Sequence, residues 1–294
     1  MENKESSSSI VMKEIFPYTG KAHVIGITGP LGTGKSSLVD QLVRSYRLQS
    51  KKVAVLAVDP SSPISGGAIL GDRVRMLEHS LDSNVYIRSM ASRGDEGGLS
   101  RASKDAVRIL DAAGFDLIFV ETVGIGQTEV EIVDIADTIV VVLMPELGDE
   151  IQAAKAGLVE IGDIFAINKS DLPGADKVLY NLSPMLSTKE SGWKQTAIKV
   201  SAKSVVGIGA LVAAIDDHEV FLKSSIGATI ARSTQRLKKE LIDRVSDLVA
   251  LNLRKRLEED PEFNLALEEL SKKQLDPETA SRRIAQRYIS RDTN

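Results

Sequence analysis

The chain has 294 residues, enough for one large domain or two small ones, and its 37 Lys and Arg against 41 Asp and Glu disfavour a strongly basic nucleic-acid-binding surface. No apolar run reaches the roughly eighteen residues of a membrane span, and the acidic, serine-rich start is unlike a signal peptide, so we expect a cytoplasmic protein that binds neither membrane nor nucleic acid. The absence of cysteine excludes disulfides, thiolate catalysis and Cys-ligated metals.

Seven apolar runs of strand length follow one another along the chain, and most are continuous rather than alternating. Strands buried on both faces have this pattern, and the stretches between them have helical spacing. We therefore predict an α/β fold with a doubly wound, mostly parallel sheet wrapped by crossover helices. The predicted strands span residues 23–28, 52–59, 84–90, 116–121, 138–144, 163–168 and 197–202, and the predicted helices 34–49, 100–113, 149–160 and 206–224.

Residues 29–36, Gly-Pro-Leu-Gly-Thr-Gly-Lys-Ser, match the pattern G-x-x-x-x-G-K-[ST] between the first strand and the first helix. Glycines let the backbone wrap around phosphate oxygens, Lys35 can reach the β- and γ-phosphates, and Ser36 can ligate Mg²⁺. The loop alone leaves the base and the reaction open, because kinases, ATPases and G proteins all carry it. The predicted phosphate-binding residues are Gly29, Leu31, Gly32, Thr33, Gly34, Lys35, Ser36 and Ser37.

Two later loops favour guanine as the base. The run Asn168-Lys169-Ser170-Asp171 follows the sixth predicted strand, and the Asp171 carboxylate can accept hydrogen bonds from the N1–H and the exocyclic amine of guanine, a donor pair that adenine lacks. The run Ser201-Ala202-Lys203 follows the seventh strand, where a backbone N–H can meet the guanine oxygen. GTP is therefore favoured over ATP. The predicted base-side residues are Asn168, Lys169, Asp171, Ser201, Ala202 and Lys203.

The fourth predicted strand ends in Glu121, whose carboxylate can hold Mg²⁺ directly or through water, and Gly124 follows, whose N–H can meet a γ-phosphate. Asp59, at the tip of the second strand, is a candidate ligand for the same metal. Ile125 stands where Ras-like G proteins have the glutamine that orients the attacking water, so we expect slow intrinsic hydrolysis, with Gln127 as a weak substitute. The three histidines show no metal-ligand spacing and are expected in solvent or satisfied in the core: His23, His79 and His218.

The predicted strands stop before about residue 229, and a long helix running to about Glu259 follows. Its apolar stripe consists of Leu237, Leu241, Val245 and Leu248. Two shorter helices are predicted at 263–273 and 277–290. Such a tail cannot bury its stripe alone, so it packs on the sheet domain or pairs with a second copy. We expect a short N-terminal arm, a GTPase domain and a helical dimerisation region, at residues 1–22, 23–228 and 229–294.

Long stretches of the chain resemble the MeaB/ArgK-type P-loop GTPases, which attend adenosylcobalamin-dependent methylmalonyl-CoA mutase and include the human MMAA protein as a relative. The resemblance is carried by the phosphate loop and by residues 57–76, 92–138 and 145–171. It implies a homodimeric GTPase chaperone that couples the binding and hydrolysis of GTP, with Mg²⁺, to loading, gating or protection of the cobalamin cofactor of that mutase or a related acyl-CoA mutase.

The resemblance also implies roles for individual residues. Asp59 and Asp72 fall in a first switch and Glu121 heads a second, all three near Mg²⁺. Residues 145–155 correspond to a further switch that responds to the mutase, in which Asp149 and Lys155 join Lys35 and Glu121 as candidate catalytic groups. Family members usually carry a helical extension before the phosphate loop that contributes to mutase contact, whereas only about twenty residues precede His23, which leaves the mode of partner binding open.

Other functions remain as alternatives. A nickel-insertion GTPase of hydrogenase or urease normally shows Cys or clustered His, which this chain lacks. A partitioning-type ATPase would carry an additional lysine where Pro30 stands. A small-molecule kinase, the activity that the older family name (amino-acid transport kinase) suggests, would need a second substrate pocket and a general base. A GTP-binding module without turnover is a further alternative, because its sequence features would be the same as those of a slow GTPase.

Overall fold

The structure, a computed structural model, describes residues 7–59, 76–79, 81–91, 101–122, 131–145 and 157–289. Several residues singled out above lie outside these ranges: Asp72, Gly124, Ile125, Gln127, Asp149 and Lys155. The predicted helix at 149–160 falls within the described part only from residue 157 onward. The chain divides into two compact units, Met1–Thr229 and Ile230–Asn294.

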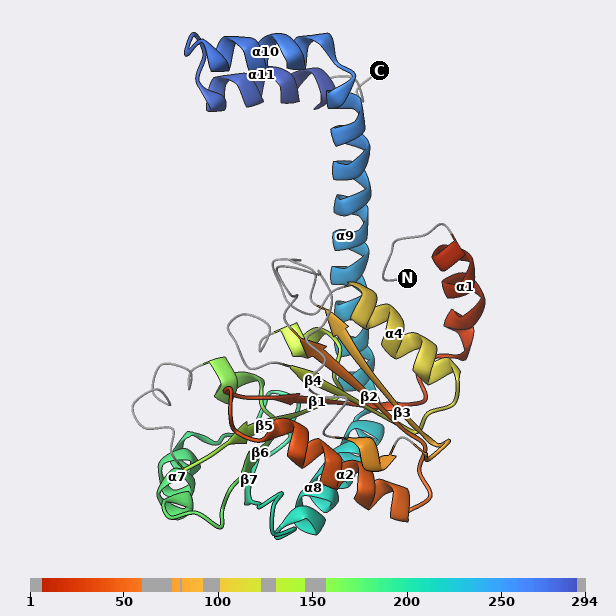
Figure 1. Ribbon diagram of the computed structural model, residues 1–294, viewed down its shortest axis with the longest axis vertical. Helices are drawn as coiled ribbons and strands as arrows, with labels where there is room; N and C mark the ends of the chain where they lie inside the picture. The colour runs from red at the N-terminus through yellow and green to blue at the C-terminus, as the bar shows by residue number, and fades with distance from the viewer. Residues whose placement is uncertain are drawn as a thin grey trace. The chain divides into compact units, whose positions relative to one another are not determined.

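A seven-stranded sheet in the order β3-β2-β4-β1-β5-β6-β7 forms the centre of the first unit (Figure 1). Every pairing between neighbouring strands is parallel. The strands are β1 (His23–Thr28), β2 (Val53–Asp59), β3 (Val85–Ala91), β4 (Leu117–Thr122), β5 (Thr138–Leu143), β6 (Ile164–Ile167) and β7 (Thr196–Lys199). The predicted α/β fold class is confirmed, and the order places β1, with its phosphate loop, at the centre of the sheet.

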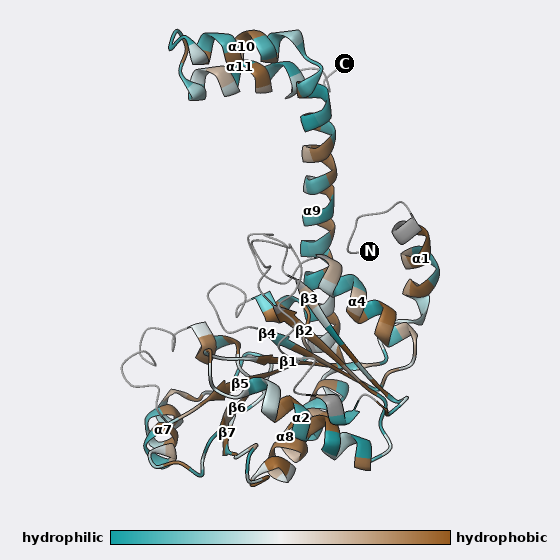
Figure 2. Cartoon of the chain, viewed as in Figure 1, coloured by the Kyte–Doolittle hydropathy of each residue, from teal (hydrophilic) through white to brown (hydrophobic). Residues whose placement is uncertain are grey.

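Helices cover both faces of the sheet, which explains the continuous apolar runs. The core on one face joins the strands to α2 and α8, and the core on the other joins them to α4 and α7. The strands are mostly hydrophobic in Figure 2, as burial on both faces requires. The helices of this unit are α1 (Ser7–Ile15), α2 (Lys35–Leu48), α4 (Arg101–Ala112), α7 (Ala175–Leu182) and α8 (Ile208–Ser224), with 3-10 turns at Phe16–Tyr18, Leu77–His79, Ile132–Asp134 and Ser183–Met185.

The N-terminal arm contains a helix that the sequence patterns did not predict. Helix α1 packs against α4, and the Arg108 guanidinium lies 5.7 Å from the centre of the Phe16 ring. Beyond it, the buried Asp111 carboxylate accepts hydrogen bonds from the backbone N–H groups of Gly20, Lys21 and Ala22. A nine-residue helix is marginal in isolation, so these tertiary contacts decide its formation.

A buried hydroxyl joins β1, β5 and α8. Thr138 Oγ1 lies 2.8 Å from His23 Nε2 and 2.7 Å from His218 Nδ1, and all three side chains are buried. Trp193 packs 4.5 Å from the His218 ring, between ring centres, and donates to the Asp163 carbonyl. Burial lowers the pKa of His23 below its ordinary value of 6.5, against the opposing effect of the Asp137 carboxylate. Both histidines therefore belong to the core of the first unit.

This buried histidine predicts a dependence of stability on pH. The folded state resists protonation of His23, so its contribution is complete above pH 6.5, the ordinary pKa, and is lost as the pH falls toward the lowered folded value. The free energy of unfolding should decrease by up to about 1.4 kcal/mol per pH unit in that window. Chemical denaturation at several pH values tests this. His23→Gln should flatten the slope, and an unchanged slope in that variant would contradict the assignment.

The second unit consists of the greater part of α9 (Ile226–Glu258), followed by α10 (Pro261–Ser271) and α11 (Pro277–Ile289). Helix α10 begins two residues before the predicted position because the Asp260 side chain caps it, accepting from the Glu262 N–H at 3.0 Å, and Pro261 occupies its first turn. A small core holds the two short helices together through Ala266, Ala280 and Ile284. In the described ranges, no helix is both long and apolar enough to cross a bilayer.

Candidate functional site

The phosphate loop connects β1 to α2 and requires glycine at two crowded positions. Gly29 has φ +133°, and a Cβ there would lie 2.2 Å from the Val142 carbonyl oxygen. Gly34, the N-cap of α2, has φ +84°, and a Cβ there would lie 2.6 Å from Asn168 Nδ2. Only glycine fits these positions without displacing neighbours. The loop therefore brings its backbone to the N-terminus of α2, where N–H groups and the helix dipole favour an anion.

Lys35 and Ser36, the first residues of α2, are buried polar side chains at the base of this loop. Lys35 Nζ donates to the carbonyl oxygens of Gly29 at 2.9 Å and Pro30 at 3.1 Å, which holds the ammonium group across the loop. Ser36 Oγ donates to Glu121 Oε1 at 2.7 Å. The lysine predicted to bind phosphate is thus followed directly by the serine predicted to bind Mg²⁺. That serine contacts Glu121, the carboxylate predicted to bind the same ion.

The side-chain oxygen atoms at the start of α2 and at the end of β4 fit a magnesium ion. Ser36 and Glu121 supply a hydroxyl and a carboxylate, the hard oxygen ligands that Mg²⁺ prefers. Within the described ranges, no group of three or more His, Cys, Asp or Glu side chains is arranged to hold a metal. Two protein ligands suffice for Mg²⁺, which usually completes its shell with water and substrate phosphates. Asp59 ends β2 at the same edge of the sheet, but its side chain lies outside the described part.

Asn168 ties three loops together. It is buried at the end of β6, and its Nδ2 donates to the Thr33 carbonyl of the phosphate loop at 2.8 Å. Its Oδ1 accepts from the Ala202 N–H, in the loop after β7, at 3.1 Å. One amide side chain therefore sets the position of the phosphate loop relative to both base-side loops.

Asp171 presents its carboxylate at the surface, and Ser201 holds it there. Ser201 Oγ donates to Asp171 Oδ1 at 2.6 Å and accepts from the Ser204 N–H at 3.2 Å. That hydrogen bond lowers the pKa of Asp171, with the positive charges of Lys203 and Lys169 acting in the same direction. The carboxylate is therefore an ionised acceptor at neutral pH, as recognition of two adjacent N–H donors requires.

Comparison with known proteins identifies the family. A family model described as methylmalonyl-CoA mutase-associated GTPase MeaB matches residues 1–258. The chain belongs to the MeaB family. A protein named as a GTPase from Pyrococcus horikoshii is 44% identical to this MeaB-family chain over 99% of it and 92% of the relative. The GTPase ArgK of Escherichia coli is 34% identical over 75% of this chain and 69% of its own length.

Two further relatives extend the comparison of this MeaB-family chain. The mouse methylmalonic aciduria type A homolog is 38% identical over 63% of this chain and 46% of its own length. A crystal structure of a protein named LAO/AO transport system kinase matches with a TM-score of 0.68 and 25% identity, over 96% of this chain and 86% of that one. The relatives and the matched fold agree on a P-loop GTPase that binds and hydrolyses GTP.

Some predicted site residues of this MeaB-family GTPase have exposed side chains. Leu31 is 65% exposed, and the Ser37 and Lys203 side chains are also exposed. The sequence patterns also missed a hydroxyl pair, in which Thr122 Oγ1 donates to Thr28 Oγ1 at 3.0 Å and joins the tips of β4 and β1. The sequence could have indicated this pair, because each threonine is the last residue of a buried strand. Thr28 directly precedes the phosphate loop and Thr122 directly follows Glu121.

Proposed function

We propose that this GTPase assists an adenosylcobalamin-dependent acyl-CoA mutase, of the methylmalonyl-CoA mutase type, in loading, gating or protection of its cofactor. The support is the match to the mutase-associated family over residues 1–258, together with the name of the mouse relative. The kinase alternative is supported only by the name of one protein of similar fold, and nothing further favours the nickel-insertion alternative.

Within this proposal the phosphate loop and Lys35 bind the β- and γ-phosphates of GTP. When GTP binds, the Lys35 ammonium group gives up its hydrogen bonds to the loop carbonyls and binds phosphate oxygens instead. The backbone N–H groups at the start of α2 bind the same phosphates. Ser36 and Glu121 hold Mg²⁺, joined by Asp59 and Asp72 from the first switch. The ion would neutralise phosphate charge.

The guanine base is recognised by the loops that follow β6 and β7, which Asn168 links to the phosphate loop. Asp171 accepts from the N1–H and the exocyclic amine of guanine, while the loop of Ser201, Ala202 and Lys203 supplies a backbone N–H to the guanine oxygen. The observation that carries this assignment is the pair of hydrogen bonds made by Asn168, which link the phosphate loop to both base-side loops. Asp149 and Lys155 remain candidate catalytic groups of the mutase-responsive switch.

Association with the mutase is tested directly by sedimentation of the two purified proteins together. We expect a complex whose affinity differs between GDP and a non-hydrolysable GTP analogue, because the proposed switches respond to the γ-phosphate. Equal binding with both nucleotides, or none to any cobalamin-dependent acyl-CoA mutase tested, would contradict the chaperone role.

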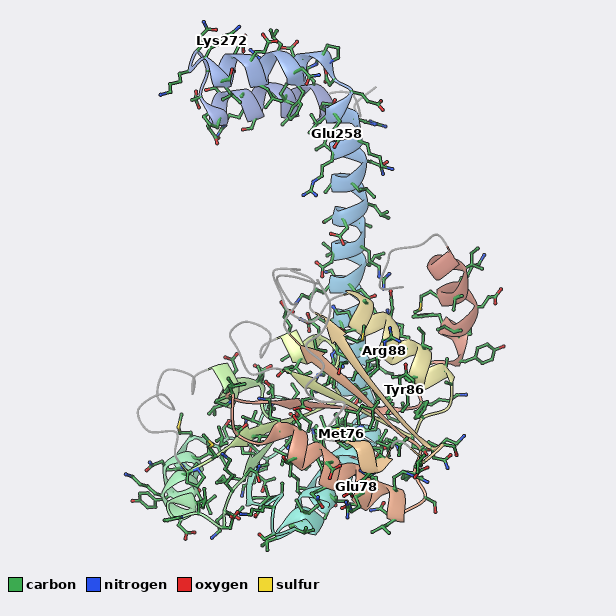
Figure 3. All side chains as sticks on the ribbon, viewed as in Figure 1. Met76, Glu78, Tyr86, Arg88, Glu258 and Lys272 are labelled. Atoms are coloured by element: carbon green, nitrogen blue, oxygen red, sulfur yellow. The ribbon has the colours of Figure 1, made fainter. Side chains whose placement is uncertain are left out.

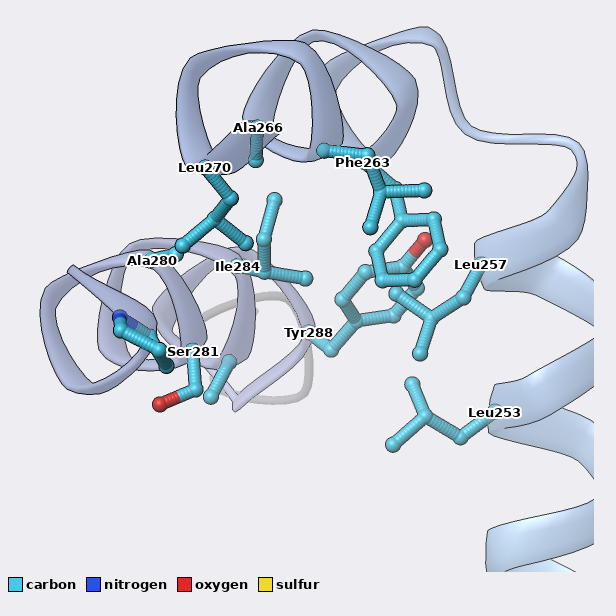
Figure 4. A pocket seen from close by; sticks show the side chains of 12 residues that line it. Leu253, Leu257, Phe263, Ala266, Leu270, Ala280, Ser281, Ile284 and Tyr288 are labelled. Atoms are coloured by element: carbon cyan, nitrogen blue, oxygen red, sulfur yellow. The ribbon is translucent and has the colours of Figure 1, made fainter. Parts of the chain in front are cut away.

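The proposed partner of the second unit is another copy of the chain. The α9 residues Leu237, Leu241, Val245 and Leu248 are about half exposed or more. Beside them in sequence, the end of α9 and the two short helices surround an apolar cavity of about 280 Å³ (Figure 4), lined among others by Leu253, Leu257, Phe263 and Ile284. Exposed apolar side chains in such number mark an interaction site. Pairing with a second copy would bury the stripe, as the family resemblance implies.

The dimer proposal predicts a specific effect of charge on α9. The double substitution Leu241→Glu and Leu248→Glu should convert a dimer into a monomer, since charges in an apolar interface are costly to desolvate. Leu48→Glu, on the 85% exposed end of α2, is the matched control and should leave the dimer intact. Light scattering with size exclusion measures the mass. A wild-type monomer, or a dimer that survives the double substitution, would overturn the proposal.

A further inference from the structure

Ser89, on the edge strand β3, carries a buried hydroxyl that the site described above does not use. Its Oγ is shielded from solvent, and the described residues offer it no hydrogen-bond partner. A buried hydroxyl without a partner costs folding free energy, so such a group calls for a ligand that completes it.

The sheet register places this residue in line with the predicted metal ligand. Ser89 is opposite Ala57 on β2, and Ala57 is opposite Glu121 on β4. Residues in register on parallel strands point to the same face, and two strand spacings separate Ser89 from Glu121 by about 10 Å between Cα atoms. Ala57 is buried and contributes only a methyl group between the two polar side chains.

The face in question is the one that α2 covers. Ile87, two residues before Ser89, packs with the core that includes α2, and Ser36 of α2 bonds Glu121 on this face. Tyr86 and Arg88, labelled on β3 in Figure 3, alternate with Ile87 and Ser89 and so belong to the opposite face. The Ser89 hydroxyl therefore lies on the same face of the sheet as Glu121 and at the same register level, and Glu121 is one of the magnesium-binding residues of the proposed function.

We propose that Ser89 is a positioning residue for the magnesium ion, its hydroxyl binding a water molecule of the ion's outer shell on the β3 side of the site. The inference rests on the proposed function, since the ion belongs to the nucleotide site. Mg²⁺ keeps several waters when it binds a nucleotide, and groups that bond those waters orient the inner ligands. The site would thus extend from α2 and β4 across β2 to the edge strand.

The test compares release of a fluorescent GDP analogue in excess Mg²⁺ and in EDTA. The ratio of the two rates measures how much the ion retains the nucleotide. Ser89→Ala should reduce that ratio, on the order of tenfold, with little change in the EDTA rate. Ser89→Thr keeps the hydroxyl and should restore the ratio. Without nucleotide, Ser89→Ala should unfold at the wild-type temperature or above it, because an unsatisfied group has been removed.

A wild-type ratio in Ser89→Ala would overturn the inference and leave the proposed function standing. So would a reduced ratio that Ser89→Thr fails to restore and that comes with a lower unfolding temperature, because that result indicates general distortion. If the wild type itself shows no effect of Mg²⁺, the proposed magnesium site is wrong and the inference fails with it. Should Ser89→Ala not fold, Ser89→Cys, whose thiol is a weak donor of similar size, takes its place with the same expected loss.

Discussion

Replacing Lys35 by alanine should weaken GTP binding severely. Lys35 is 6% exposed, and its ammonium group already donates to the loop that would surround the phosphates, so its removal leaves phosphate charge uncompensated in a buried site. Truncating one partner of such a charge pair costs about 2–5 kcal/mol, so the affinity should fall at least about thirtyfold. Titration of the fluorescence of a labelled nucleotide measures it.

The matched control for Lys35→Ala is Lys177→Ala, because Lys177 is exposed on α7 and should have no effect on affinity. Thermal unfolding without nucleotide separates lost binding from lost folding. A Lys35→Ala protein that is folded and binds GTP as the wild type does would contradict the assignment of the phosphate site.

Asp171→Asn should weaken GTP and improve xanthosine triphosphate. The new amide donates where the carboxylate accepted, so it faces the guanine N–H groups with a donor but can pair with the C2 carbonyl of xanthine. Ser201 can still donate to the remaining side-chain oxygen, so the loop should keep its geometry. We expect the ratio of the two affinities to change by roughly a hundredfold, since an unpaired polar group in the base site is costly.

Competition between the two nucleotides for a labelled GDP analogue gives that ratio. Asp176→Asn is the matched control, because Asp176 is an exposed carboxylate five residues further along whose partner is Lys199. An Asp171→Asn protein with wild-type preference would show that guanine is recognised elsewhere.

The sheet could be predicted from the sequence because burial on both faces produces continuous apolar runs. The last strand shows the limit of that rule. The apolar run at 197–202 suggested a strand to Ala202, whereas β7 ends at Lys199 and Ser201 turns to bridge Val206. The turn serves the site, since it brings the Ser201 hydroxyl to Asp171.

Contacts between distant residues could not be predicted in the same way. The motifs named Asn168, but not its hydrogen bond to Thr33, 135 positions earlier in the chain. Likewise, α1 packs against α4, and the segment that follows α1 is held by Arg108 and Asp111 of α4, contacts that no local pattern indicates. Ser89 carries no motif at all, and only the strand register relates it to Glu121.

Turnover of GTP by the purified chain, alone and with a cobalamin-dependent acyl-CoA mutase, tests the central claim most directly, with ATP as the control nucleotide. We expect a slow basal rate that is specific for GTP, because Ile125 occupies the position of the water-orienting glutamine, and acceleration when the mutase is added. A basal rate that every such mutase leaves unchanged would contradict the chaperone role, and a preference for ATP would contradict the assignment of the base site.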